Sequence, residues 1–388
     1  MYLWLLPASA TYGLLILLDL LIYTYIASRL EATSLYLGLC NAIWSITYIL
    51  STYGLGKLAD SGRPRILMAL SAIGLAVSLA CISNLDLVRG LAAYTFHAIS
   101  LVTANLSINT IVFENIDSEN WRRALLVVRT FAFGTRGVLL IALATMQLTN
   151  IAPMLMVALV LAIASSVSVP STAVLTEREL YRLYGIAKNV NTYLKASTSL
   201  LYMDRPDVMR TLFSRLWESR PKIETSRVLI ASMLVVATGE YVLAFLPLMV
   251  KNFVSLQTLW IAYGISSLSS VAVMLLLHNM ESERKNLAQL MIALRTFTLL
   301  GGFVYARDAT TLAGYLFITS AMFFVIDTTL YNLFISSTGG YRISLYHVFR
   351  ELGSVVGSLL GGVLLPMGTN VYVGTALIMT ALSIVVLF

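Results

Sequence analysis

Two apolar segments, each long enough to cross a membrane, are separated by the polar stretch Gly56-Lys57-Leu58-Ala59-Asp60-Ser61-Gly62-Arg63-Pro64-Arg65. Gly62 supplies the backbone freedom that a tight turn needs, and Gly56 allows a neighbouring helix to approach closely. Asp60 is followed in the sequence by the opposite charges of Arg63 and Arg65, its candidate partners. The stretch is therefore predicted to form a polar hairpin between two transmembrane helices.

The composition around this hairpin is that of a membrane protein. Of the 388 residues, 58% are hydrophobic and 12% are charged, and the mean hydropathy is +0.83, a balance that excludes a soluble globular domain. The apolar runs are long and unbroken, which favours helices over a β-barrel. Cys40 and Cys81 lie in apolar runs and predict neither a disulfide nor a metal site. The first residues lack a basic cluster and a cleavage site, so we expect a retained first helix rather than a signal peptide.

Hydropathy predicts twelve transmembrane helices in two groups of six. The first group is predicted at residues 5–27, 34–57, 66–84, 87–113, 124–147 and 151–175. The second is predicted at residues 227–250, 255–278, 287–304, 311–335, 342–365 and 369–388. The expected fold class is an all-α membrane protein with two six-helix bundles, residues 1–175 and 227–388, joined by a cytoplasmic linker at 176–226.

The basic residues outside these helices are distributed unequally between the two sides. One side carries those of the hairpin, Arg122, Arg123 and the many basic residues of the linker, whereas the other carries only Arg29, Arg89, Lys251 and Arg307. Because positive charges stay in the cytoplasm, we expect both termini there and a multi-pass protein of the cell membrane. The net charge of +7 then reflects topology, and no nucleic-acid partner is needed to explain it.

The linker has its own helical signals. Thr176 and Glu179 have the spacing of a capping box, and Leu180, Leu183 and Tyr184 fall on one helical face. We expect an amphipathic helix on the cytoplasmic membrane surface. Its role as a tether between the bundles, or as a regulatory or partner-binding element, is left open by the sequence.

Charges reveal an internal repeat. A shift of 221 residues pairs Asp19 with Glu240, Asp60 with Glu281, Arg63 with Arg284 and Arg129 with Arg350. Because charges within membrane helices are rare, four matches at one offset indicate a duplicated, pseudo-symmetric bundle.

The hairpin resembles the signature loop between helices two and three of the major facilitator superfamily (MFS), with Ser61 in place of the usual basic residue. The residues that carry the resemblance are Gly56, Asp60, Gly62, Arg63 and Arg65. Glu114, followed by Arg122, matches the acidic-then-basic pattern that the family has after helix four. The resemblance implies that these seven residues form a conformational switch, in which the charged ones, with Arg123, make a cytoplasmic cluster that holds the halves together; independent solvated loop charges are the alternative.

The resemblance also places helix eleven between the two bundles, where Gly353, Gly357 and Gly361 recur every four residues and predict close packing. It implies that helices one, four, seven and ten line a central cavity. In this chain they carry four ionisable residues that we take as candidates for proton coupling: Asp19, His97, Glu240 and Asp327.

Arginines are the other candidates for the cavity. Arg136 is predicted at the depth of Asp19, and Arg350 at the depth of Asp327, so each pair is a candidate ion pair; Arg129 is predicted to line the cavity mouth or to extend to the membrane surface. The repeat places Gly357 where a partner of Glu240 would stand, which makes Glu240 the favoured proton-coupling residue, since an unpaired carboxylate in a low-dielectric setting takes up a proton readily. His97 is alternatively a neutral packing residue, and Glu240 could face water or pair with Arg295.

The sequence contains no nucleotide-binding loop, no His-Glu-x-x-His motif and no nucleophile elbow. We therefore expect a secondary active transporter rather than an enzyme, one that moves a small solute with protons, as a monomer and without cofactor or metal. A membrane sensor or scaffold that acts through the linker is the main alternative, and a membrane-embedded enzyme is the third.

Overall fold

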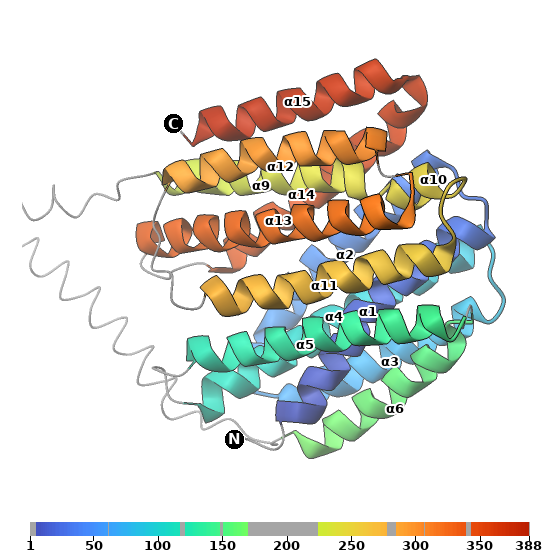
Figure 1. The fold of residues 1–388 in the computed structure, drawn as a ribbon. Helices are drawn as coiled ribbons and strands as arrows, with labels where there is room; N and C mark the ends of the chain where they lie inside the picture. The colour runs from blue at the N-terminus through green and yellow to red at the C-terminus, as the bar shows by residue number, and fades with distance from the viewer. Residues whose placement is uncertain are drawn as a thin grey trace, which may run out of the picture.

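The computed structural model describes residues 5–60, 62–116, 121–147, 150–169, 224–277, 285–305, 307–338 and 343–387, and the regular elements in these ranges are all helices (Figure 1). The predicted linker helix at 176–226 and the second hairpin around Glu281 lie almost wholly outside the described residues. The side chains of Asp60, Glu114 and Arg122, which were predicted to form the charge cluster, also lie outside them.

Six long helices form the first part of the chain: α1 (Leu5–Arg29), α2 (Ser34–Asp60), α3 (Pro64–Ile82), α4 (Leu87–Asn115), α5 (Trp121–Thr145) and α6 (Ala152–Ser168). The predicted hairpin joins α2 to α3, and Gly62 has the positive φ of 66° that only glycine adopts easily. Pro64 starts α3, where its missing N–H costs no hydrogen bond. Asp86 caps α4 by accepting a 2.8 Å hydrogen bond from the backbone N–H of Arg89.

The second part contains α9 (Thr225–Leu243), α10 (Leu246–Val250), α11 (Leu256–Leu277), α12 (Lys285–Tyr305), α13 (Ala309–Thr338), α14 (Ile343–Leu364), the 3₁₀ turn η2 (Leu365–Met367) and α15 (Thr369–Val386). The helix predicted at 227–250 is interrupted, because Pro247 has no N–H to donate to the carbonyl of Leu243. The carbonyl of Ala244 also has no helical donor, because the N–H of Leu248 donates to the carbonyl of Phe245 instead, and it accepts a 2.7 Å hydrogen bond from the hydroxyl of Tyr23.

All twelve predicted spans correspond to long helices of the described chain, so the predicted all-α membrane fold is confirmed. Ten of the helices are long and apolar enough to cross a membrane. Of the other two, α6 is apolar but has 17 residues, and α12 carries Lys285, Gln289 and Arg295 among its 21 residues.

Helix α14 packs tightly against α9 on one side and α2 on the other. A side chain at Gly353 or Gly357 would collide with the backbone of Met233 or Ala237 on α9, so these glycines make the predicted close contact. On α2, a Cβ atom at Gly38 would lie 2.6 Å from the carbonyl oxygen of Ser358. Helices α5 and α11 make a second close crossing, and they lie side by side in Figure 1.

The two parts of the chain are joined at one end, which we call the distal end; it carries the α1–α2 turn at 30–33 and lies opposite the two termini (Figure 1). Near it, the indole N–H of Trp260 donates to the hydroxyl of Thr24 at 3.0 Å, and Ser34 donates to the carbonyl of Gly362 at 3.0 Å. These contacts hold α1 and α2 against α11 and α14 and close the distal end.

Candidate functional site

A cavity in two adjoining parts lies between the helices. The first part, about 270 Å³, is lined by α5, α9, α11, α12 and α13, and the second, about 310 Å³, by α1, α2, α4, α9, α11, α13 and α14. Glu240, Tyr263 and Phe323 line both parts. Four of the lining helices are α1, α4, α9 and α13, the ones that the resemblance implied.

Asp19 and His97 face each other across α1 and α4. The Nε2 atom of His97 lies 2.9 Å from the backbone oxygen of Leu15, and because a carbonyl only accepts, Nε2 carries the hydrogen. Nδ1 of the neutral ring is then an acceptor, and it lies 3.8 Å from Oδ1 of Asp19, which is too far for a hydrogen bond. Neither atom has another partner in the described residues. The two acceptors therefore leave a place for one proton between them.

The cavity reaches Asp19 but not His97. The Asp19 side chain is 33% exposed and lines the second part of the cavity, whereas His97 is fully buried behind it. A proton held by Asp19 is thus accessible from the cavity, and His97 supports it from the protein side.

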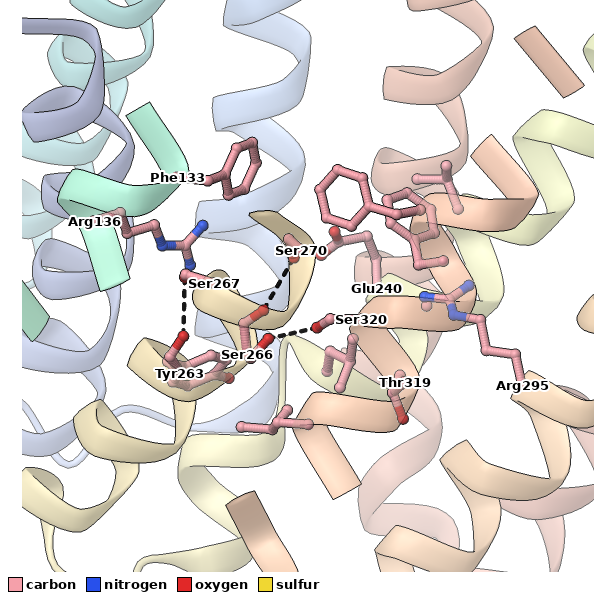
Figure 2. Close-up of a pocket in the computed structure, with 16 residues that line it drawn as sticks. Phe133, Arg136, Glu240, Tyr263, Ser266, Ser267, Ser270, Arg295, Thr319 and Ser320 are labelled. Atoms are coloured by element: carbon pink, nitrogen blue, oxygen red, sulfur yellow. Dashed lines mark hydrogen bonds between the residues drawn. The ribbon is translucent and has the colours of Figure 1, made fainter. Parts of the chain in front are cut away.

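The predicted ion pair between Asp19 and Arg136 is not formed in the described structure. Their charges are close enough to interact, but no oxygen of Asp19 lies within ion-pair distance of the Arg136 guanidinium. The prediction used depth along the helices alone, and Arg136 instead faces the first part of the cavity (Figure 2).

Glu240 is held by polar groups from other helices. Its Oε2 atom accepts a 3.0 Å hydrogen bond from the side-chain amide of Asn41 on α2. The same amide lies 3.4 Å from the hydroxyl of Ser354 on α14, which is also 2.9 Å from the hydroxyl of Ser45. Asn41 therefore ties α2 to α9 and α14 at the level of Glu240.

Glu240 forms no ion pair within the described residues, but the charge of Arg295, its alternative partner in the sequence analysis, acts on it. Arg295 of α12 lines the same part of the cavity, and its Nη2 atom would lie 2.6 Å from a Cβ placed at Gly239. Arg295 does not extend to the membrane surface, because its side chain is buried against the ring of Phe323, 4.7 Å from the ring centroid. The repeat offset did not indicate this cation, because the offset placed the equivalent position on α14, whereas Arg295 lies on α12.

The ion pair predicted for α13 and α14 is present. Nη1 of Arg350 lies 3.3 Å from Oδ2 of Asp327, and the hydroxyl of Tyr346 donates to Oδ1 at 3.1 Å. With both carboxylate oxygens occupied, Asp327 is a less suitable proton carrier than Asp19.

Arg129 on α5 is exposed and lines neither part of the cavity.

The hairpin residues contact two neighbouring elements: the carbonyl of Pro64 accepts a 2.9 Å hydrogen bond from the hydroxyl of Ser107 on α4, and Arg65 reaches the end of α6. Nε of Arg65 donates a 2.6 Å hydrogen bond to the carbonyl of Val169 after α6, and Arg63 is exposed at the start of α3. Arg65 thus anchors α3 to the end of α6 within the first six helices. The switch cluster as a whole stays a prediction.

Several cavity residues were missed in the sequence. Asn41 and Glu351 are strongly polar residues within predicted membrane helices, the same signal that identified Asp19 and Glu240. A band of hydroxyls on α11 and α13 was also missed, although its spacing in the sequence marks one helix face: Ser266, Ser267, Ser270, Thr319 and Ser320. Phe133 and Phe324 pack edge to face, with centroids 5.3 Å apart, and form the apolar wall.

Known structures identify the fold. No protein-family model and no curated protein sequence matches the chain. A mutant of the nucleoside transporter NupG is similar over 99% of this chain and 98% of its own, with a TM-score of 0.65 and 14% identity. The xylose transporter XylE from E. coli, in a partially occluded inward-open conformation, is similar over 96% and 95%, with a TM-score of 0.63 and 12% identity.

A third structure is that of a bacterial homologue of the human lysosomal transporter Spinster, in an inward-facing and unoccupied conformation. It is similar over 94% of this chain and 81% of its own, with a TM-score of 0.61 and 13% identity. These proteins are membrane transporters with the fold of the major facilitator superfamily. This chain has that fold, which confirms the resemblance seen in the hairpin at the level of the fold.

Proposed function

We propose that the protein is a secondary active transporter that moves a small solute by alternating access, with both termini in the cytoplasm. The observation that carries the proposal is the polar cavity between the first six and the later six helices, with contacts that close it at the distal end. A buried cavity of this kind between two helix groups serves transport when the groups open alternately to either side. The fold that the chain shares with NupG and XylE supports the same function.

The finer proposal is coupling to protons through Asp19, supported by His97. The Oδ1 atom of Asp19 and the Nδ1 atom of His97 both lack a donor in the described residues, so one proton between them replaces two repelling lone pairs. The charged and titratable groups that face Asp19 come from four other helices: Arg136 on α5, Tyr94 and His97 on α4, Glu240 on α9 and Glu351 on α14. Glu240 remains the second candidate, since it lines both parts of the cavity.

Transport is tested with the full-length protein in sealed lipid vesicles. Uptake of a panel of radiolabelled nucleosides, sugars and organic acids is measured with and without an imposed pH gradient, against empty vesicles. We expect at least one solute to exchange across the membrane without a gradient and to accumulate when the outside is acidic. Exchange without pH-driven accumulation would support transport and contradict proton coupling. Transport itself would be contradicted if the protein moved no solute of the panel and if the distances between helices at its terminal face did not change when solutes were added.

A further inference from the structure

Two arginine side chains enter the first part of the cavity without an anionic partner. Figure 2 shows Arg136 and Arg295 on opposite sides of this pocket, with Glu240 and the serines of α11 between them. In the described structure Arg136 has no ion pair and its buried Nε has no hydrogen-bond partner. Arg295 donates one 3.2 Å hydrogen bond from Nη1 to the carbonyl of Val235, and its Nε is also without a partner.

Such groups require an anion or water. A guanidinium carries five N–H donors, and leaving them unsatisfied in a low-dielectric site costs free energy. The charged lining of this pocket consists of two guanidinium groups and the one carboxylate of Glu240, which already accepts from Asn41. Neither of the other two candidate carboxyl groups lines this pocket: Asp327 is paired with Arg350, and Asp19 lines the other part of the cavity. When Asp19 is protonated, the charged groups that act on this pocket therefore carry one excess positive charge, which matches a monoanion.

The hydroxyl band specifies what else the solute carries. Ser267 donates its hydroxyl hydrogen to the carbonyl of Tyr263 at 2.9 Å, and Ser270 donates to the carbonyl of Ser266 at 3.0 Å (Figure 2). Because these hydrogens are committed to the backbone, the two oxygens offer only lone pairs to the cavity. Groups that fit them are donors, such as the hydroxyls of a solute.

We propose that the pocket takes a small hydroxycarboxylate, with its carboxylate between Arg136 and Arg295 and its hydroxyls on the serine oxygens of α11. The inference rests on the proposed transport function and names its substrate class. A carboxylate accepts two parallel hydrogen bonds from one guanidinium, so this anion satisfies donors that a neutral solute leaves bare.

The position of Asp19 links this anion to the proton. Asp19 is the main negative charge that acts on Arg136, and Tyr94 and Tyr263 also face the guanidinium. When Asp19 takes up a proton, Arg136 loses that charge and attracts the solute carboxylate more strongly. By thermodynamic linkage the bound anion then favours the proton equally, which is the basis of symport.

Binding is tested by thermal shift and equilibrium binding of the purified full-length protein. The probes are glucuronate, gluconate and lactate, each against its neutral counterpart: glucose, sorbitol and propylene glycol. We expect at least one carboxylate to stabilise the protein while its neutral counterpart does not, and to bind more tightly at acidic than at alkaline pH. Arg136→Gln and Arg295→Gln should each weaken carboxylate binding about tenfold or more, and Arg136→Lys should weaken it less. Arg89→Gln, at an exposed arginine outside the cavity, is the control and should bind normally.

Three results would overturn the inference: equal stabilisation by a carboxylate and its neutral counterpart, no stabilisation by any of the three carboxylates, or unchanged carboxylate binding in both glutamine variants with normal melting curves. Tighter binding of glycerol phosphate than of every carboxylate would overturn the assignment to carboxylates. Vesicle uptake of neutral solutes separates a failure of this inference from a failure of the proposed function. A protein that transports neutral sugars would still be a transporter, and only the assignment to hydroxycarboxylates would be lost.

Discussion

At the residue scale, the carboxyl groups of Asp19, Asp327 and Glu240 differ in the hydrogen-bond partners that surround them. Asp19 has an oxygen without a donor, facing an imidazole nitrogen without a donor. Asp327 has both oxygens occupied by Arg350 and Tyr346. Glu240 has one oxygen on the amide of Asn41, a contact that both the protonated and the ionised carboxyl accept. Of the three, Asp19 is the group whose surroundings change most when a proton arrives.

Asp19→Asn should uncouple transport from protons. The amide supplies a permanent N–H toward Nδ1 of His97, so the variant resembles the protonated state, and we expect exchange without accumulation under a pH gradient. Vesicle uptake with and without the gradient measures both. Asp86→Asn, at an exposed cap where asparagine serves equally well, is the control and should keep both activities. Wild-type pH dependence in Asp19→Asn, together with its loss in Glu240→Gln, would move the proton site to Glu240.

Asn41→Ala should weaken the contact between α2 and α9. The change removes the donor to Glu240 and should lower the free energy of unfolding by about 1 to 3 kcal/mol. It should also expose the distal half of the cavity, which thiol labelling of single-cysteine variants measures. Asn105→Ala is a matched control, because Asn105 bonds to Tyr48 within the first six helices. Equal labelling of the two variants would mean that Asn41 does not hold the distal end closed.

At the element scale, α14 owes its position to glycines whose missing side chains leave room for α9. Gly357→Ala would place a methyl group against the backbone of Ala237, an overpacking that costs about 1 to 3 kcal/mol. Gly374 on α15 has no atom within 4 Å of a Cβ position, so Gly374→Ala should stabilise its helix by about 0.5 to 1 kcal/mol. Thermal unfolding of both variants in detergent checks the opposite signs. An equal response would show that α14 tolerates a wider separation from α9.

The elements were predictable from the sequence because hydropathy and helix length follow from the membrane itself. The break between α9 and α10 was not predicted, since Pro247 lies inside a run whose hydropathy is uninterrupted. The pairing of Asp327 with Arg350 was predicted from depth and is present, whereas the pairing of Asp19 with Arg136 was predicted in the same way and is absent. Rise along a helix gives depth, but the direction of a side chain around the helix depends on packing, which hydropathy does not encode.

The same limit explains the rest of the site. Asn41 is one polar residue in an apolar helix, and its contact with Glu240 bridges 199 residues of sequence. The sequence named Arg295 only as an alternative partner of Glu240, because an offset between equivalent helices gives no information about the position of a third helix. The four lining helices, by contrast, were implied by the resemblance alone and contribute to the cavity as expected.

At the scale of the whole molecule, several hydrogen bonds of the described residues join the first six to the later six helices in the distal half, among them Tyr23 to Ala244, Trp260 to Thr24 and Ser34 to Gly362. Asn41 and Ser45 on α2 add contacts to Glu240 and Ser354. Under the proposed function, we interpret this arrangement as a state that opens toward the terminal face. Two of the similar structures are described as inward-facing or partially occluded and inward-open. The alternating access that we propose would require these distal contacts to break in each cycle, at a free-energy cost that binding of the solute and the proton would offset.

A disulfide across the distal end should therefore stop transport. Ser34 on α2 donates to the carbonyl of Gly362 on α14 at 3.0 Å, and a Cβ at Gly362 would lie 3.3 Å from Cα of Leu35, so cysteines at 34 and 362 are close enough to bridge. In a background where Cys40 and Cys81 are alanine, oxidation of Ser34→Cys/Gly362→Cys should abolish uptake into vesicles, and a reductant should restore it. The pair Gly74→Cys/Ser100→Cys joins α3 to α4 within the first six helices, where a Cβ at Gly74 would lie 3.5 Å from Cβ of Ser100, and it should leave uptake intact when oxidised. Full uptake by the oxidised 34–362 protein, with the bridge verified by mass spectrometry, would show that the distal end stays closed throughout the cycle and that the solute takes another path.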